Sequence, residues 1–319
     1  MVRRLLCPAL VVVALAAGAA RAEPPAWLAA VTCDLASDPG DAPRARSDEA
    51  QLTELREFAY SLRLVGNKSH TRFPSYSYVA FTFDDGPSYK TTPLVMAALE
   101  KYDIPATFFV NAVHIVGTSR GVQKNRETLR DAVRRGFHIG NHTFHHKNLA
   151  HVRPALFQRE IEQSADAIEQ VIGYRPYLVR FPYGVRTQPL RDYLDQEGYV
   201  EVRWNIDSDD FKIHDRRRLR QSAIQQIADW NGGVVLFHDP KPWTAAVIGQ
   251  VFDDLEAENC RRLKTSEPLL LPVSLHYFAR ERNGNPRPVP EAVRARTQRY
   301  IEALPTRCKA RIDKTRSSQ

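Results

Sequence analysis

The stretch Tyr78–Ser88, YVAFTFDDGPS, joins a buried-strand pattern to a polar turn. The run Tyr78–Phe83 is apolar almost throughout, which predicts a strand buried on both faces. Asp84 and Asp85 follow it directly, and the glycine and proline after them are typical turn residues. A helical pattern comes next. This order of buried strand, polar turn and helix recurs along the chain and decides the fold.

Strand and helix patterns alternate about seven times between residues 76 and 278. The strands predicted are Tyr78–Phe83, Ala106–Val110, Phe137–Gly140, Tyr177–Phe181, Tyr199–Ile206, Gly232–Asp239 and Leu269–Phe278. The helices predicted are Thr92–Tyr102, Arg126–Arg135, Pro154–Ile172, Gln188–Gly198, Arg216–Trp230 and Thr244–Cys260. Such alternation is typical of a parallel α/β sheet or barrel.

Polar clusters follow five of the predicted strands: DDGPS, NHTFHH, PYG, DSDD and HD. In an α/β barrel the carboxyl ends of the strands share one face, where active sites lie. We therefore expect these clusters, although far apart in sequence, to converge in space.

In the stretch His138–His146, HIGNHTFHH, three of the four histidines, His142, His145 and His146, lie within about one helical turn. On a helix, His142 could share a face with either His145 or His146. An isolated histidine is more often structural, but two at ligand spacing beside a strand-end carboxylate favour a metal. Two imidazoles, one carboxylate and an open fourth position form a catalytic zinc set. The spacing alone leaves the choice of the second histidine open.

Three later motifs are weak one by one. They are RFPYG (Arg180–Gly184), DSDDF (Asp207–Phe211) and LFH (Leu236–His238). An arginine at a strand end is usually a surface ion pair, and a run of acidic residues can be a simple loop. Taken together they add a cation, a carboxylate and a further imidazole to the same predicted face.

In their order and spacing, TFDDGPS, HTFHH, RFPYG, DSDDF and LFH resemble the five motifs of the NodB-type polysaccharide deacetylases, carbohydrate esterase family 4. The resemblance covers about residues 75–278. It implies a distorted (β/α)7-type barrel, here with N- and C-terminal extensions. It also implies metal-dependent removal of acetyl groups from N-acetylated sugars.

By position, the resemblance assigns the metal ligands and the groups around the base. Asp85, His142 and His146 become the ligands of one divalent ion, most often Zn²⁺, and His145 stays outside the set. Asp84 becomes the general base, and Arg180 the residue that holds its carboxylate.

The same resemblance makes His238 the general acid and Asp210 the carboxylate that orients it. Substrate contacts fall on Tyr183, through its backbone N–H, on Leu236 in the acetyl pocket, and on two aromatic residues. One is Phe211, where the family usually has Trp; the other is Trp243, for which packing in the barrel wall is an equal alternative.

The N-terminus predicts export. Residues 1–22 combine a basic start, a short apolar run and a small-x-small site, as in a secretory signal peptide. Residues 23–74 would then be an N-terminal extension, and the mature protein, periplasmic or extracellular, would keep no stable membrane insertion. Cys7 would leave with the signal, so that two of Cys33, Cys260 and Cys308 could pair.

Residues 279–319 carry 11 Lys/Arg and 4 Asp/Glu, a formal charge of +7 in a chain of +8. The basic character therefore belongs to this C-terminal extension, for which we expect a solvated, partly helical tail; attraction to an acidic polymer is the alternative. Nucleic acid is a poor partner for such a chain, because no aromatic interleaving or binding motif accompanies the charge. The oligomeric state is left open.

Three functions fit this sequence. The first is an exported hydrolase that removes N-acetyl groups from an N-acetylhexosamine polymer or oligomer, such as chitin or peptidoglycan, and releases acetate. The second is an esterase that removes O-acetyl groups from acetylxylan. The third, a catalytically silent sugar-binding module, is disfavoured because base, ligands and acid are all present.

Overall fold

The computed structural model describes residues 78–265, 267–278 and 291–316, with side chains for 294–313 of the last segment. The predicted signal peptide, its cleavage site, the extension 23–74 and Cys33 lie outside the described residues. Within the described ranges, none of the helices has the length and apolarity that a bilayer crossing needs.

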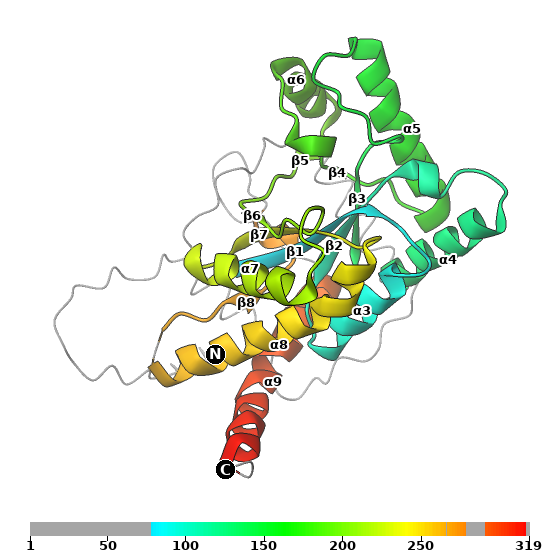
Figure 1. Cartoon of the computed structure of the whole chain (residues 1–319). Helices are drawn as coiled ribbons and strands as arrows, with labels where there is room; N and C mark the ends of the chain where they lie inside the picture. Colours follow the sequence, from blue (N-terminus) through cyan, green and yellow to red (C-terminus); the bar gives the residue numbers. More distant parts are fainter. Residues whose placement is uncertain (1–77, 266, 279–290, 317–319) are drawn as a thin grey trace, which may run out of the picture. The chain divides into compact units, whose positions relative to one another are not determined.

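The core is a parallel sheet in the order β5-β4-β3-β2-β1-β7-β6, with β8 paired to the start of β1. Its strands are β1 (Tyr78–Gly86), β2 (Ala106–Val110), β3 (His138–Asn141), β4 (Leu178–Val179), β5 (Val200–Glu201), β6 (Ile206–Asp207), β7 (Gly233–His238) and β8 (Leu271–Pro272). Among the described residues no ladder joins β5 to β6. The sheet is thus a curled, open barrel, which confirms the distorted (β/α)7-type fold (Figure 1).

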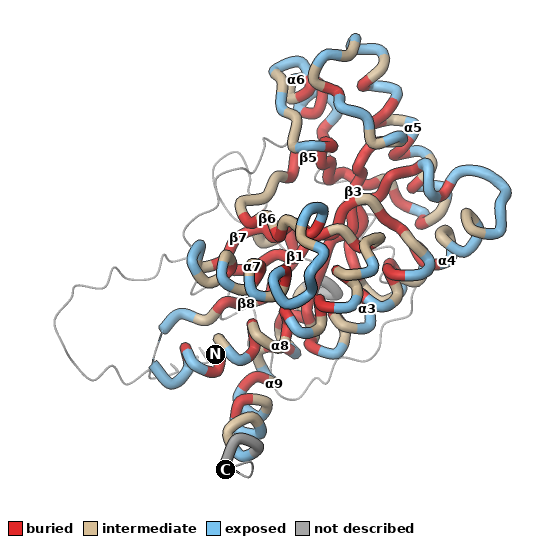
Figure 2. Tube along the Cα trace, viewed as in Figure 1, coloured by how far each residue is buried: buried red, intermediate tan, exposed pale blue. Residues whose placement is uncertain are grey.

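Helices cover the outside of this sheet. They are α3 (Thr92–Lys101), α4 (Arg120–Arg134), α5 (Pro154–Ile172), α6 (Gln188–Glu197), α7 (Arg216–Asp229), α8 (Pro242–Thr265) and α9 (Glu291–Arg316), with 3₁₀ turns η1 (Ala112–His114), η2 (Pro182–Gly184) and η3 (Leu275–Phe278). Each packs on its neighbours: α3 and α7 on α8, α4 on α5, and α5 on α6. The strands lie buried beneath them, and exposed residues lie on the outer helix faces (Figure 2).

Aromatic and aliphatic side chains of the strands form this core. Phe83 of β1 stacks between Phe108 and Phe237 of the strands on either side, at ring-centroid distances of 5.2 and 5.9 Å. All three rings are buried. A buried aromatic side chain contributes about 1.5–3 kcal/mol of transfer free energy, so the central strands are strongly fixed. This rigidity matters because β1 and β7 carry the candidate site at their carboxyl ends.

One predicted strand, Tyr199–Ile206, is wrong as a single element because the chain changes partner within it. The Val202 N–H donates to Val179 O of β4 at 2.8 Å, whereas the Asn205 N–H donates to Val234 O of β7 at 3.2 Å. The segment therefore bridges the open side of the barrel instead of extending either ladder.

Several other boundaries differ from prediction; β1 extends to Gly86, β4 is reduced to Leu178–Val179, and α8 extends to Thr265. The expected strand Leu269–Phe278 is reduced to β8, followed by the 3₁₀ turn η3. Helix α4 begins at Arg120, six residues before the predicted Arg126, because the Ser119 hydroxyl accepts the Val122 N–H and caps a polar first turn that has no apolar periodicity. By contrast, α5 has the predicted bounds, from Pro154 to the left-handed Gly173.

The expectation of a solvated C-terminal tail is wrong for α9. Tyr300 and Leu304 are buried in the core cluster, and Cys308 forms a disulfide with Cys260 of α8. Of the three open cysteine pairings, the structure thus has the one that does not involve Cys33.

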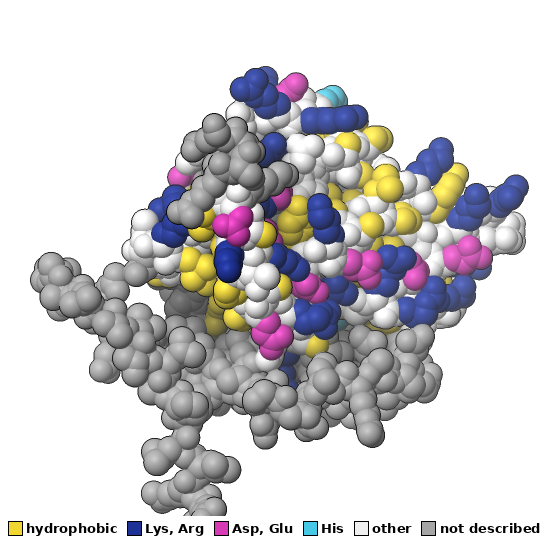
Figure 3. All heavy atoms as spheres, turned by 90° about the horizontal axis from the view of Figure 1, so that it is seen from below, with side chains coloured by type: hydrophobic (Ala, Val, Ile, Leu, Met, Phe, Trp, Pro, Cys, Tyr) yellow, Lys and Arg dark blue, Asp and Glu magenta, His cyan; other side chains and the backbone are white. Residues whose placement is uncertain are grey.

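Three arginines of α9, Arg299, Arg307 and Arg311, pair with carboxylates of the barrel. Arg307 contacts Asp103 and Glu256 at 2.9 and 3.3 Å, and Arg311 contacts Glu256 at 3.1 Å. Part of the positive charge of α9 is therefore neutralised by acidic residues of the barrel. On the face drawn in Figure 3, Lys and Arg side chains lie among Asp and Glu side chains.

We expect loss of the disulfide to weaken the fold by about 2–4 kcal/mol, because it closes a loop of 48 residues and ties α9 to α8. Thermal unfolding of the wild type with and without reductant, beside Cys308→Ser, measures this. Both should melt at the same lowered temperature, and reductant should not change the variant. An unchanged melting temperature for Cys308→Ser would contradict the expectation.

Candidate metal centre and active site

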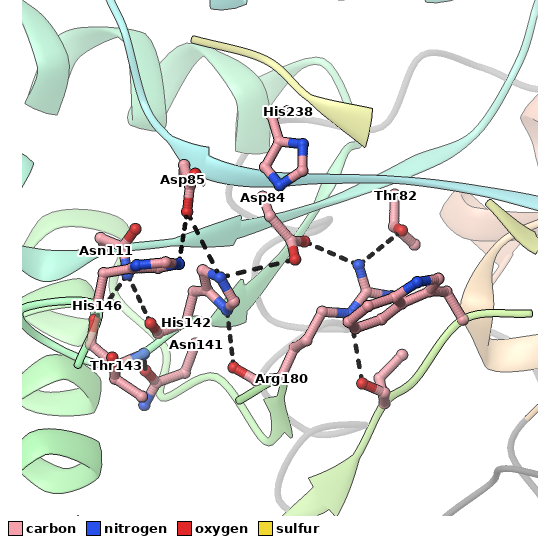
Figure 4. A network of polar contacts seen from close by, with 12 residues as sticks. Thr82, Asp84, Asp85, Asn111, Asn141, His142, Thr143, His146, Arg180 and His238 are labelled. Carbon is pink, nitrogen blue, oxygen red and sulfur yellow. Dashed lines mark hydrogen bonds and ion pairs between the residues drawn. The ribbon is translucent and has the colours of Figure 1, made fainter. Parts of the chain in front are cut away.

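The predicted site residues converge at the carboxyl ends of the strands, as the clustering of polar motifs indicates. Asp84 and Asp85 end β1, and His142 follows β3. Asp84 lies opposite His238 of β7 in the ladder register. Arg180 follows β4 and reaches Asp84 across the barrel. Figure 4 shows these groups pointing toward one another.

Asp85, His142 and His146 form the one cluster of potential metal ligands found among the described residues. Oδ1 of Asp85 lies 3.5 Å from Nε2 of His142 and 3.1 Å from Nε2 of His146. This geometry favours His146 over His145 as the second histidine of the cluster. His145 points away and contacts Glu160 of α5.

The helical geometry considered for the histidine spacing is wrong. Residues 142–146 form an irregular loop, in which Thr143 and His146 have left-handed φ values of 69° and 56°. These two reversals, and not a helical turn, bring the imidazoles to a ring-centroid distance of 5.0 Å. Asn111 supports the loop from β2, since its amide donates to the His142 carbonyl at 2.5 Å.

The donor set fits a divalent metal on two observations. Oδ1 of Asp85 is buried and has no hydrogen-bond partner among the described residues, which is costly for a carboxylate without a cation. The Nδ1–H of His142 donates to the Arg180 carbonyl at 2.8 Å, which leaves Nε2 unprotonated on the side of Asp85. Burial lowers the pKa of His142 to about 3, so the imidazole is neutral, as a ligand must be.

Asp84 and Arg180 form a buried ion pair beside the ligand cluster. Nη1 of Arg180 lies 2.8 Å from Oδ1 of Asp84 and 2.8 Å from the Thr82 hydroxyl, while Oδ2 of Asp84 lies 3.6 Å from Nε2 of His142. Burial raises the pKa of Asp84 above its ordinary 3.8, and the positive charge of Arg180 opposes this. The shift brings the carboxylate toward the range in which it can accept a proton near neutral pH.

His238 and Asp210 form a second pair across β1. Oδ1 of Asp210 accepts from Nδ1 of His238 at 2.5 Å, and Oδ2 accepts from the His238 N–H at 2.7 Å and from the Thr244 hydroxyl at 2.6 Å. Burial alone would lower the pKa of His238, but the hydrogen bond and charge of Asp210 outweigh it and raise the pKa to about 9. The imidazole is therefore protonated at neutral pH.

The four predicted substrate contacts differ in their exposure. Tyr183 is 68% exposed, with a left-handed φ of 61°, and its ring lies 4.8 Å from that of His146. Phe211 is 45% exposed and meets the His238 ring edge-on at 6.1 Å. Leu236 is buried in β7. Trp243 donates its indole N–H to Asp210 O at 2.6 Å and covers His214 at 4.1 Å, which favours the packing alternative.

Asp239, the second residue of the strand-end cluster HD, is not among the site residues that the sequence predicts. Asp239 is fully buried behind β1 and bonds to the Thr92 hydroxyl. A Cβ at Gly86 would lie 2.5 Å from its carboxylate, which explains the glycine after Asp85. Burial raises the pKa of Asp239 to about 7. Glu160 and Asn111 were also missed, because only the folded loop places them beside the histidines.

Comparisons with known proteins agree with this geometry. Residues 73–202 match the family model described as polysaccharide deacetylase. A chitooligosaccharide deacetylase of Bradyrhizobium is 33% identical over 192 residues, which cover 60% of this chain and 81% of that protein. The solved structure of a family 4 carbohydrate esterase from Streptomyces lividans in complex with acetate is 30% identical at a TM-score of 0.50, covering 57% of this chain and 88% of that one.

The peptidoglycan-N-acetylmuramic acid deacetylase PdaC of Bacillus subtilis is 30% identical over 200 residues, which cover 63% of this chain. This chain spans only 40% of the length of that relative. The family match ends at residue 202, before Asp210 and His238. Those two residues are therefore supported here by their own geometry.

Proposed function

Because this chain belongs to the polysaccharide deacetylase family, we propose that it hydrolyses the N-acetyl groups of an N-acetylhexosamine polymer or oligomer and releases acetate. The observation that carries the proposal is that two hydrogen-bonded pairs, each of a carboxylate and a basic side chain, lie at the same face of the barrel as the candidate metal ligands. The Asp84–Arg180 pair lies beside the Asp85, His142 and His146 cluster. His238, which is paired with Asp210, lies opposite Asp84 in the ladder between β1 and β7.

A divalent metal held by Asp85, His142 and His146 would supply Lewis-acid polarisation of the acetyl carbonyl and a water of lowered pKa. The protein's own side chains and backbone carry out the proton transfers and hold the reacting groups. Asp84 accepts the proton of the attacking water at its carboxylate, and Arg180 holds this carboxylate in place. The backbone N–H of Tyr183 is proposed to donate to the developing oxyanion.

His238 acts as the general acid in this proposal. Its Nδ1–H is held by Asp210, so the Nε2–H remains to protonate the departing sugar amine. The amine is a poor leaving group unless protonated, which is why a charged imidazole is needed on this side. Leu236 would line the acetyl pocket and Phe211 would contact the sugar.

Zn²⁺ is the metal that we propose. Two imidazole nitrogens and one carboxylate oxygen match a catalytic zinc set, which keeps a position open for water or substrate. Metal analysis of the purified protein identifies the ion, and one equivalent of zinc per chain is the expected result.

We propose a chitin-like or peptidoglycan substrate outside the cytoplasm. The relatives named above are a chitooligosaccharide deacetylase and a peptidoglycan deacetylase. The exposed rings of Tyr183 and Phe211 offer contact surface for a sugar. The Cys260–Cys308 disulfide and the predicted signal peptide support an oxidising, periplasmic or extracellular location.

Acetate release tests the proposed function. The full chain is incubated with chito-oligosaccharides, peptidoglycan and acetylxylan, each with and without a chelator. Release from an N-acetylated substrate that stops with chelator is expected. Release from acetylxylan alone would replace the amidase with an esterase, and no release from any of the three would favour a sugar-binding module.

The pH dependence of kcat/KM provides a further prediction. The alkaline limb should follow deprotonation of His238, whose pKa is raised to about 9. Asp210→Asn removes the charge that raises it, so the limb should move to lower pH, by about 1–3 units. Asp229→Asn, at the far end of α7, is the control and should keep the wild-type profile.

The raised pKa of His238 also makes the stability of the fold depend on pH. Because the folded-state pKa of His238 lies above its ordinary 6.5, protonation stabilises the fold fully below about 6.5. This contribution disappears as the pH rises through about 9.

For the kinetic prediction, an alkaline limb of kcat/KM that does not move in Asp210→Asn would exclude His238 as the general acid.

A further inference from the structure

The two candidate metal-binding histidines are held in different ways. His142 is fixed at its ring, because its Nδ1–H donates to the Arg180 carbonyl. For His146, the structure gives no hydrogen bond to Nδ1 within the described ranges; its ring meets Asp85 and the edge of Tyr183. The position of the His146 imidazole must therefore be set by its backbone.

That backbone is in a left-handed conformation, with φ of 56° at His146. A residue with a Cβ adopts this conformation only where the surroundings enforce it, at a cost of order 1–3 kcal/mol. The groups that hold its two chain neighbours are consequently the ones that aim the imidazole. Both neighbours contact the same carboxylate.

This carboxylate is Glu160 of α5, which is 2% exposed. Oε2 accepts the backbone N–H of His145 at 2.8 Å, and Oε1 accepts the Nδ1–H of the His145 ring at 2.8 Å. Oε1 also lies 3.3 Å from the Lys147 ammonium. Burial alone would raise the pKa of Glu160, but these donors together lower it, so the carboxylate is ionised.

The other half of the loop is held from η1, the 3₁₀ turn that follows β2. The backbone N–H groups of Ala112 and Val113 donate to the carbonyls of Thr143 and Phe144, at 3.2 and 3.0 Å. These contacts end at Phe144, two residues before His146. Among the described residues, Glu160 is the one with polar contacts to residues on both sides of His146.

We propose that Glu160 is a positioning residue for the metal site: it clamps His145 and Lys147 and so aims His146 at Asp85. The inference rests on the proposed function, because it needs the metal. In this proposal His145, which lies outside the ligand set, links Glu160 to the loop that carries His146. The proposal also identifies a buried carboxylate on a helix, away from the barrel face, as a determinant of metal affinity.

The test measures Zn²⁺ affinity by competition with a chromophoric chelator, and not activity. Glu160→Gln keeps the shape but places an amide N–H₂ against one of its donors and removes the charge. We expect the dissociation constant to rise about 10–100-fold, as for other groups that orient a ligand. His145→Ala keeps the backbone hydrogen bond, so a smaller rise is expected.

Glu162→Gln is the matched control. Glu162 is also on α5 and accepts hydrogen bonds from Tyr193 and Tyr199 at 2.7 and 3.2 Å, away from the metal ligands. We expect Glu162→Gln to lower the stability of the metal-free protein and to leave its zinc affinity unchanged. Melting of the metal-free proteins separates the two effects.

If Glu160→Gln does not fold, the double variant His145→Ala/Lys147→Ala carries the test, because it removes both side-chain contacts to Glu160 and leaves only the backbone hydrogen bond of His145. Wild-type zinc affinity in the variant that folds would overturn the proposal. Absence of zinc binding in the wild type would instead contradict the proposed metal site itself, so the two failures are distinguishable.

Discussion

Replacing Asp84 by asparagine is expected to lower kcat/KM for acetate release by about 10²–10⁴-fold, the usual contribution of a general base. The amide is nearly isosteric and can still accept a hydrogen bond from Arg180, but it cannot take a proton from water. Asp84 is outside the ligand set of Asp85, His142 and His146. Zinc content should therefore stay at the wild-type level.

Two measurements check this expectation together. Acetate release under identical conditions gives the change in kcat/KM, and metal analysis of the same sample gives the occupancy. Asp195→Asn makes the same carboxylate-to-amide change at an exposed position of α6 and is the control. It should leave acetate release and zinc content unchanged. Turnover within a few fold of the wild type in Asp84→Asn would exclude Asp84 as the base.

Replacing His142 by alanine should abolish both metal binding and turnover. His142 is the most buried of the three ligand residues and is already fixed in the ligating tautomer by the Arg180 carbonyl. Its loss leaves two donors, too few for a catalytic zinc site. The expected result is a protein that contains less than about a tenth of the wild-type zinc after dialysis, since ligand loss costs more than the 10-fold that loss of an orienting partner costs.

His151→Ala is a suitable control, because this exposed imidazole lies in the loop after the ligands. The variant should keep its zinc. Circular dichroism of His142→Ala excludes general unfolding as the cause of metal loss. Normal zinc occupancy in a folded His142→Ala protein would contradict the ligand assignment.

The sequence predicts best what local chemistry determines. Pro154 and Gly173 mark the two ends of α5 because a proline at the start and a left-handed glycine at the end are signals within the helix itself. The buried run of β2 is similarly self-contained. The strand-end clusters predict the site face because parallel strands end on one side.

The rest depends on contacts between distant segments. Tyr199–Ile206 has a strand composition throughout, and only pairing with β4 and then with β7 divides it. Glu160 is one of several acidic residues on an amphipathic helix, and nothing in the sequence of α5 distinguishes it from Glu162. The histidine loop could be read as a helical turn because left-handed φ values at Thr143 and His146 leave no mark in the residue types.

Arg180 contacts more of the molecule than its role beside Asp84 requires. Its Nε and Nη2 atoms reach the carbonyls of Val202 and Arg203, at 3.3 and 3.5 Å, in the segment that bridges the open side of the barrel. The guanidinium also lies over the rings of Phe109 and Trp204. One side chain thus holds both the segment that bridges the open side of the barrel and the carboxylate of Asp84. A substitution at Arg180 that changed the basicity of Asp84 would therefore also change how the two ends of the sheet are joined.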